Sequence, residues 1–145
     1  MTIPLACIFC NIIKKQAPSF PVYEDDNFLV ILDIRPVFLG HCLLLPKFHF
    51  ATLADLPETQ AILFFSLMRK LSQAVEEAMQ AEGTFIAINN KVSQSVPHLH
   101  LHVIPRKKGD GLKGFFWPRQ KYEDAQALQS VQTKIQEVMT RLDKS

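Results

Sequence analysis

Residues 97–103 place three of the chain's five histidines at alternate positions, His98, His100 and His102. Alternation of polar and aliphatic residues is typical of a β-strand, because successive side chains of a strand point to opposite faces. The run therefore predicts a strand with three imidazoles on one face and aliphatic side chains packed in a core on the other. Three histidines at strict period two are hard to explain by packing alone, so we interpret this face as a functional site.

The rest of the chain alternates apolar stretches with turn-forming residues. Besides the histidine strand, these stretches predict strands at 22–24, 28–34, 41–46 and 84–89 and helices at 7–15, 55–80 and 122–142. The first two strands are close enough along the chain to form an antiparallel hairpin. The sequence therefore predicts a single α+β domain over residues 1–145, with an antiparallel five-stranded sheet, one long central helix and a C-terminal helix.

The long helix has signals at both ends and surplus apolar surface. Asp55 is predicted to be its N-cap, with Glu58 completing a capping box, and Gly83 lies near the place of a C-terminal cap. One apolar stripe is enough for a helix that covers a sheet. Further apolar residues beside that stripe indicate a second burial partner, either more of the same chain or, as we favour, another subunit: Ile62, Leu63 and Leu67.

Composition limits the classes of partner. A hydrophobic content of 48% with 21% charged residues is typical of a folded globular protein, and a net charge of +2 argues against a surface for polymeric nucleic acid. No apolar run approaches the ~20 residues that a membrane span needs, and the N-terminus lacks the features of a signal peptide. We therefore expect a cytoplasmic protein with no membrane partner.

Two of the three cysteines, Cys7 and Cys10, form a C-x-x-C pair. In a reducing compartment this spacing favours metal binding or redox chemistry over a structural disulfide. The pair alone is only half of a zinc site. The alternative is that both thiols are small buried hydrophobic groups of the first helix.

A catalytic metal is the first hypothesis for the three histidines. Three imidazoles with one open position form a zinc site that activates water. However, His98 and His102 would lie roughly 13 Å apart along a straight strand. Ligands held at ~2 Å from one ion cannot include all three without bending the strand, so the spacing counts against this hypothesis.

Nucleophilic chemistry on a phosphate uses the row of histidines as it stands. An imidazole can attack phosphorus and form a covalent intermediate, which splits one difficult displacement into two easier ones. Neighbouring imidazoles can orient it and transfer protons near neutral pH. We therefore expect His100 to attack, with His98 and His102 assisting. The loop that leads into the strand offers donors for the phosphate oxygens: Asn89, Gln94 and Ser95.

Residues 98–104 fit the H-φ-H-φ-H-φ-φ signature of the histidine triad (HIT) superfamily, and other blocks resemble the family in family order. They are Cys7-Ile8-Phe9-Cys10, Tyr23-Glu24-Asp25, Leu32-Asp33-Ile34-Arg35-Pro36, Gly40-His41 and Leu45-Pro46-Lys47-Phe48-His49-Phe50. The resemblance covers about residues 5–106 and leaves a C-terminal extension of about 107–145. It implies a HIT-like fold and homodimers whose sheets join.

The resemblance also implies an enzyme that acts on purine nucleotides. Such proteins hydrolyse or transfer at the α-phosphate of nucleoside phosphoramidates, dinucleoside polyphosphates or related nucleotides. By position, His100 would be the nucleophile of a nucleotidyl-histidine intermediate, assisted by His98 and His102. Ser95 and Gln94 would bind the phosphate and the leaving group.

The same resemblance assigns the rest of the nucleotide site. Asp33 would hold the ribose hydroxyls, and His41 matches a position near the triad. Three side chains would surround the base: Phe9, Phe28 and Ile34. Ser93 stands where family members commonly have glycine, which leaves Asn89 and Asn90 as alternative contacts to an α-phosphate oxygen.

A structural zinc site completes the assignments that the resemblance implies. Its ligands would be Cys7, Cys10, His49 and His98, a Cys₂His₂ set that closes a tetrahedron. His98 is thus a candidate for both zinc binding and catalysis. A non-catalytic nucleotide-binding or zinc-dependent adaptor module is the alternative to an enzyme, and a metal-dependent hydrolase is a third hypothesis.

Overall fold

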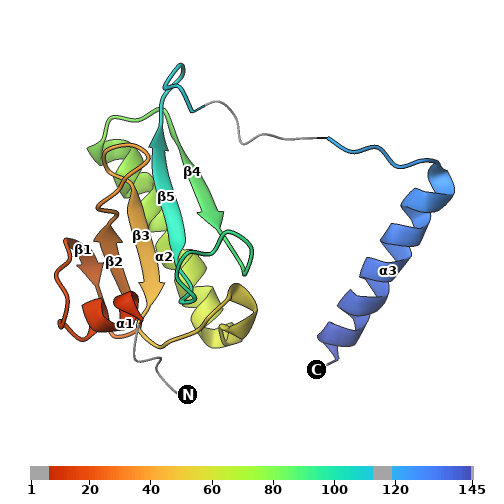
Figure 1. Ribbon diagram of the computed structural model, residues 1–145, viewed down its shortest axis with the longest axis horizontal. Helices are drawn as coiled ribbons and strands as arrows, with labels where there is room; N and C mark the ends of the chain where they lie inside the picture. The colour runs from red at the N-terminus through yellow and green to blue at the C-terminus, as the bar shows by residue number, and fades with distance from the viewer. Residues whose placement is uncertain (1–6, 113–118, 145) are drawn as a thin grey trace. The chain divides into compact units, whose positions relative to one another are not determined.

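The computed structural model describes residues 7–112 and 119–144. Contacts within the chain separate two units, Met1–Asp110 and Gly111–Ser145. The first unit contains the sheet, and the second contains the C-terminal helix (Figure 1). The boundary lies a few residues beyond the predicted core motifs, while a single domain over residues 1–145 stays a prediction.

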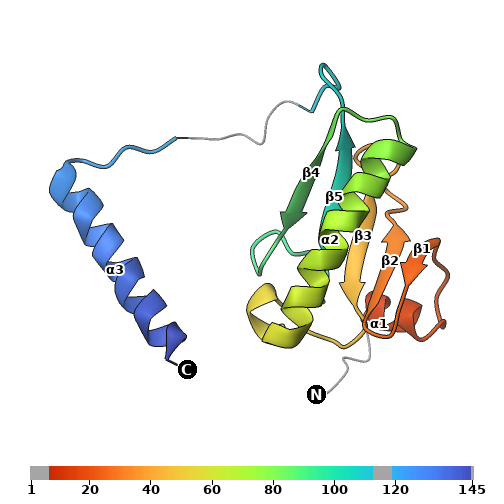
Figure 2. The same ribbon diagram turned by 180° about the vertical axis from the view of Figure 1, so that it is seen from behind.

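Antiparallel strands of the first unit form one sheet in the order β1-β2-β3-β5-β4. The strands are β1 (Pro21–Glu24), β2 (Phe28–Leu32), β3 (Cys42–Pro46), β4 (Gly83–Ile88) and β5 (Leu101–Arg106). Helix α1 (Ile8–Ile13) lies on one face, and helix α2 (Glu58–Ala78) crosses the other after a 3-10 turn at Leu53–Asp55 (Figures 1 and 2). The predicted α+β class and antiparallel five-stranded sheet are confirmed.

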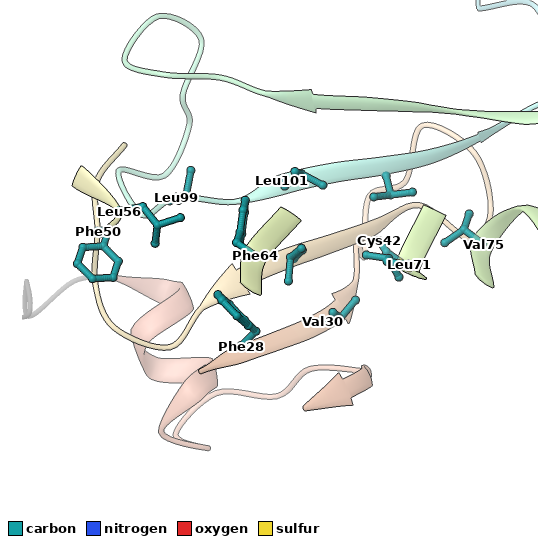
Figure 3. Close-up of a cluster of buried hydrophobic side chains, with 12 residues drawn as sticks. Phe28, Val30, Cys42, Phe50, Leu56, Phe64, Leu71, Val75, Leu99 and Leu101 are labelled. Atoms are coloured by element: carbon teal, nitrogen blue, oxygen red, sulfur yellow. The ribbon is translucent and has the colours of Figure 1, made fainter. Parts of the chain in front are cut away.

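The sheet face beneath α2 forms the main core. Phe64 of α2 packs among Val30 of β2 and Leu101 of β5, and Leu99 belongs to the same cluster (Figure 3). The aliphatic residues of the histidine run therefore face a core, as predicted. The imidazoles that alternate with them are turned away from α2, toward the face that α1 partly covers.

The α1 face carries a smaller cluster of buried side chains. Cys7, Phe9 and Cys10 pack there on apolar residues of β2 and β3, which are Leu29, Ile31, Leu43 and Leu45. Alternation along these two strands thus supplies apolar side chains to both faces. Only the α1 face is left partly open, and it positions the site described below.

Strand β5 is shorter than the predicted histidine strand, because it begins at Leu101. Before this residue the backbone leaves the ladder. The His98 N–H donates to the Val96 carbonyl at 2.8 Å, and the Leu99 N–H donates to the Phe50 carbonyl at 2.6 Å. The prediction that all three histidines share one straight strand is therefore wrong, since the first two precede it.

The long helix begins and ends at signals other than those predicted. The Asp55 carboxylate accepts hydrogen bonds from the Thr52 N–H at 3.0 Å and the Thr52 hydroxyl at 2.8 Å, so it closes the 3-10 turn. Helix α2 begins later, at Glu58. After the helix, Gln80 takes the left-handed conformation (φ 50°), and Gly83 begins β4. The predicted Asp55 and Gly83 caps are wrong.

Apolar side chains remain exposed on α2, including Ile62, Leu63 and Phe65. Leu67 packs against the core instead. Strand β4 pairs only with β5 in the described sheet and leaves its other edge open. The exposed apolar residues of α2 and the open edge of β4 are surfaces that a second subunit could cover. None of the helices in the described residues is long and apolar enough to cross a bilayer.

The second unit contains one amphipathic helix, α3 (Ala125–Asp143), close to the predicted range 122–142. The Asp124 side chain caps it by accepting a hydrogen bond from the Ala127 N–H at 2.7 Å. Apolar residues at 3-4 spacing form a stripe along the helix, and they are exposed: Leu128, Val131, Ile135, Val138 and Leu142. The predicted C-terminal helix is confirmed as an element.

Phe64→Ala is expected to lower the free energy of unfolding by about 3–5 kcal/mol, because it empties a fully buried aromatic position. Urea unfolding at fixed protein concentration measures the change. The matched control is Phe20→Ala, since this ring lies before β1 and is 63% exposed. Equal losses from the two variants would contradict the placement of α2 on the sheet.

Candidate functional site

A pocket of about 230 Å³ opens on the α1 face, among residues of α1, β2, β3 and β5. Its apolar wall includes Phe9, Ile12, Ile31, Ile34 and Leu43, and its polar groups are Ser19, Asp33, Ser95, His100 and His102. The structure thus brings together, around one cavity, residues that are distant in sequence and were predicted for catalysis, ribose binding and base binding. The cavity combines an apolar surface with a carboxylate, hydroxyls and imidazoles.

His100 is buried and has one well-defined partner. Its Nδ1 lies 2.7 Å from the carbonyl oxygen of His98. A carbonyl can only accept, so Nδ1 must carry a proton, and neutral imidazole then has its lone pair on Nε2. The rings of Phe9 and His102 each lie 5.0 Å from the His100 ring, centroid to centroid. The bond to His98 therefore leaves the lone pair of a neutral His100 ring on Nε2.

His41 fixes the opposite tautomer in His102. The Val37 N–H donates to His41 Nδ1 at 3.1 Å, so the proton of neutral His41 resides on Nε2. His41 Nε2 lies 2.9 Å from His102 Nδ1, to which it donates. The proton of His102 is then on Nε2. His102 can therefore donate a hydrogen bond, whereas His100 offers a lone pair.

Asp33 lies beside this pair of histidines, with its Oδ2 3.6 Å from His41 Nε2. Burial lowers the pKa of His41, and the Asp33 carboxylate acts in the opposite direction. Burial is the main cause that lowers the pKa of His102 to about 4. The neighbouring imidazoles of His100 and His41 act in the same direction, and the Asp33 carboxylate acts in the opposite one. Both His41 and His102 are therefore neutral at pH 7, as their hydrogen bonds require.

The side chains of Asp33, His41 and His102 are close enough together to be considered as metal ligands. The Val37 N–H argues against that use, because it keeps the proton of His41 on the nitrogen that faces the other two. We interpret the group as a hydrogen-bonded relay that orients His102. His41 accordingly lies next to the triad, as the sequence predicted, but contacts it through His102.

Several predicted residues lie outside the pocket. Phe28 is in the core beneath α2, where its ring centroid is 5.7 Å from that of Phe64, so its predicted place beside the base is wrong. The Gln94 amide donates to the Ala51 carbonyl at 2.6 Å, and Asn90 Oδ1 accepts from the Leu53 N–H at 2.8 Å. The predicted phosphate contacts of Gln94 and of Asn89 or Asn90 stay predictions.

The four residues predicted to bind zinc form a second site next to the pocket. His98 Nδ1 lies 3.5 Å from Cys7 Sγ, 3.6 Å from Cys10 Sγ and 3.1 Å from His49 Nδ1. Cys10 Sγ lies 3.3 Å from His49 Nδ1. These four atoms fall within 4.8 Å of one another. We call this group the metal cluster.

The tautomer of His98 fits metal binding. Its Nε2 lies 2.9 Å from the Pro46 carbonyl, which can only accept, so the proton is on Nε2 and the Nδ1 lone pair faces the metal cluster. Burial lowers the pKa of His98 to about 4. Two thiols and two imidazoles are the donor set of a closed, tetrahedral zinc site. The metal cluster therefore could hold a metal such as zinc with its own residues.

His98 divides its predicted roles between side chain and backbone. Its imidazole belongs to the metal cluster, whereas its carbonyl oxygen accepts the hydrogen bond from His100. Sequence reasoning did not find the Val37 N–H, the Pro46 carbonyl or the His98 carbonyl as site groups. Backbone partners leave no mark on the residue type. Two pocket residues had a weak sequence signal from their spacing. Ile12 follows Phe9 by three positions, on the same face of a helix, and Ile31 precedes Asp33 by two positions, on the same face of a strand.

Sequence comparison agrees with the geometry. The sequence model of the HIT domain matches residues 14–109. The chain belongs to the HIT family. The protein hit of Bacillus subtilis is 39% identical over 131 residues, which cover 86% of this chain and 90% of that protein. The adenosine 5'-monophosphoramidase HNT1 of Saccharomyces cerevisiae is 37% identical, over 82% of this chain and 74% of the yeast protein.

Solved structures of HIT proteins share the fold. SMU.412c from Streptococcus mutans is 33% identical and superposes with a TM-score of 0.86, covering 94% of this chain and 87% of its own. A zinc-bound histidine triad family protein from Mycobacterium smegmatis is 34% identical with a TM-score of 0.70, covering 94% of this chain and 98% of its own. The HIT-like fold predicted from the sequence is confirmed.

The lowered pKa of His102 predicts a loss of stability in acid. The unfolded chain takes up a proton near pH 6.5, whereas folded His102 stays neutral until about pH 4, beside His100, His41 and Asp33. Stability is therefore complete above pH 6.5 and decreases as the pH falls toward 4. Urea unfolding at pH 7 and pH 5 should show a smaller decrease for His102→Gln than for the natural protein. Equal decreases would contradict the neutral, buried state of His102.

Proposed function

We propose that this HIT protein hydrolyses or transfers nucleotides by attack of His100 Nε2 on the α-phosphate of a nucleoside phosphoramidate or dinucleoside polyphosphate. The observation that carries the proposal is the hydrogen bond from His100 Nδ1 to the His98 carbonyl, 2.7 Å, which leaves the Nε2 lone pair for a reacting atom. The name of the yeast relative, an adenosine 5'-monophosphoramidase, supports the same class of substrate.

The pocket supports binding of a purine nucleotide in one orientation. Its apolar wall, which includes Phe9, Ile12 and Ile31, suits the flat face of a base. The half-buried Asp33 carboxylate can accept hydrogen bonds from both ribose hydroxyls. A nucleotide held in this way has its α-phosphate directed toward His100, while the Ser95 hydroxyl is available to a phosphate oxygen.

In the first step, the Nε2 lone pair of His100 forms a bond to the α-phosphorus, and the bond from phosphorus to the leaving group breaks. The leaving group takes the bonding electrons: an amine takes up a proton from solvent as it departs, whereas a dinucleoside polyphosphate releases a nucleoside phosphate as an anion. The Nδ1 proton stays on His100, where the His98 carbonyl stabilises the positive charge that develops on the ring. His102 Nε2–H can donate to a phosphate oxygen or to the leaving group.

In the second step, water attacks phosphorus and loses a proton to solvent while the P–Nε2 bond breaks, which releases the nucleoside monophosphate and restores the lone pair on His100. Another acceptor in place of water gives transfer. The relay from His41 to His102 keeps a hydrogen-bond donor at the phosphate throughout. No step of this scheme requires His100 to change its Nδ1 partner.

Zinc is the metal that we propose for Cys7, Cys10, His49 and His98, in a structural role. When bound, the ion would link three separate stretches of the chain in one closed tetrahedron. The zinc-bound relative from Mycobacterium smegmatis supports this assignment. Free, reduced cysteines are needed for it, which fits the expected cytoplasmic location.

Replacement of the nucleophile tests the chemistry. His100→Ala should keep the fold and lower kcat by about 10⁴-fold or more with adenosine 5'-phosphoramidate, because no other group can form the intermediate. Acid-quenched natural protein should carry a nucleotidyl adduct on His100 by mass spectrometry. Full turnover without an adduct under any quench would contradict the proposal, whereas tight binding of unchanged nucleotide would favour the adaptor alternative.

A panel of adenosine and guanosine phosphoramidates and dinucleoside polyphosphates identifies the preferred leaving group. Comparison of kcat/KM ranks the substrates by transition-state binding. Purine substrates should outperform the matching pyrimidine ones, since the apolar wall gives a larger base more contact. A preference for pyrimidines would contradict the assignment of the base pocket.

We also propose that the protein is a homodimer, formed through α2 and the open edge of β4. The exposed Ile62, Leu63 and Phe65 give α2 an apolar surface, and an unpaired strand edge can extend a sheet across two copies. Leu63→Lys should shift the sedimentation coefficient from dimer to monomer, because it places a charge in that interface. Glu77→Lys, on the exposed surface near the end of α2, is the control. A dimeric Leu63→Lys protein would contradict this interface.

A further inference from the structure

The metal cluster and the nucleotide pocket share one turn of the chain. Cys7 and Cys10 belong to the metal cluster, while Phe9, between them, is buried against the pocket. The Phe9 ring packs edge-on against His100 at 5.0 Å and against His98 at 5.8 Å, centroid to centroid. Any rotation of this turn that moves the thiols must also move the wall of the pocket and the ring beside the nucleophile.

The peptide between His98 and Leu99 is a second link. On one side its carbonyl accepts the His100 Nδ1 proton at 2.7 Å, and on the other its N–H donates to the Phe50 carbonyl at 2.6 Å. This peptide begins at His98, a residue of the metal cluster. Its N–H partner Phe50 directly follows His49, another residue of the metal cluster. Strand pairing does not hold the peptide, because the ladder of β5 begins at Leu101.

The metal cluster is weakly held by its own hydrogen bonds. Thiols are poor donors and acceptors, and the sulfur-to-nitrogen distances in the cluster are long, 3.3 Å from Cys10 to His49 and 3.5 Å from Cys7 to His98. Helix α1 has six residues, too few to be stable without tertiary contacts. A metal bound by all four side chains would therefore supply much of the rigidity of this turn.

We propose that metal occupancy of the cluster controls the nucleotide pocket, by fixing Phe9 against His100 and by fixing the His98–Leu99 peptide that holds the His100 tautomer. The metal site is then a positioning centre for the nucleophile as well as a link between chain segments. Loss of metal loosens the hydrogen bond from His100 Nδ1 and the apolar wall together, while the sheet and α2 stay folded. The choice of nucleotide as the pocket ligand, of zinc as the metal and of His100 as the nucleophile rests on the proposed function.

Imidazole NMR tests the link without any measurement of turnover. In ¹⁵N-labelled protein loaded with one equivalent of zinc, the His100 Nδ1–H should give a slowly exchanging downfield proton signal, assigned by its absence in His100→Gln. Removal of zinc with a chelator should broaden or abolish that signal, and addition of zinc should restore it. The far-UV circular dichroism spectrum should change by no more than the loss of the six-residue helix α1 would cause.

Calorimetry with AMP measures the consequence for the pocket. The dissociation constant should rise by roughly tenfold on zinc removal, in the range that coupling between two sites typically produces. Cys10→Ser should behave like the metal-free protein. Cys42→Ser is the matched control, because Cys42 is buried in the core on the other face, where its thiol donates a hydrogen bond to the Gly40 carbonyl.

The outcomes separate this inference from the proposed function. An identical His100 signal with and without zinc would overturn the link, and so would global unfolding of the metal-free protein, since the metal would then stabilise the whole fold. If Cys10→Ser does not fold, reversible stripping of the natural protein decides. Failure of AMP to bind either form would count against the proposed ligand, while the His100 signal would still decide the link.

Discussion

A single hydrogen bond, from His100 Nδ1 to the backbone oxygen of His98, determines what the candidate site can do. It places the proton of His100 on one nitrogen and leaves the lone pair on the other, beside a carboxylate and a neutral donor imidazole. The same ring without this bond could adopt either tautomer, whereas His102 would keep the proton that His41 fixes on its Nε2. The proposed chemistry thus depends on two histidines whose hydrogen bonds favour opposite tautomers, His100 through a carbonyl and His102 through His41.

The sheet makes this arrangement compatible with a stable fold. One face is covered by α2 and buries an apolar cluster around Phe64, so it supplies stability without involving the site. The other face is only partly covered by α1, which leaves room for the pocket and brings the metal cluster beside it. Burial on that face also lowers the pKa of His98 and His102, which keeps both rings neutral as their hydrogen bonds need.

Much of this could be predicted from sequence, because alternation and family motifs report which face a side chain takes. The imidazoles opposite the aliphatic residues, the four metal-cluster residues and the pocket residues Phe9 and Asp33 all follow from such patterns. The errors have physical causes. The backbone bends before Leu101, where Leu99 bonds to Phe50 instead of a strand neighbour, and Phe28 alternates onto the core face. Carbonyl and amide partners such as Pro46 and Val37 are independent of residue type, so no motif could reveal them.

The position of the phosphorus in the trapped intermediate tests the central claim most directly. Protein with ¹⁵N-labelled histidine, quenched during turnover of an adenosine phosphoramidate, would be examined for ³¹P–¹⁵N coupling within His100. The account predicts a bond from phosphorus to Nε2, with Nδ1 still protonated by virtue of its hydrogen bond to His98. A phosphorus atom bonded to Nδ1, or to any residue other than His100, would contradict it.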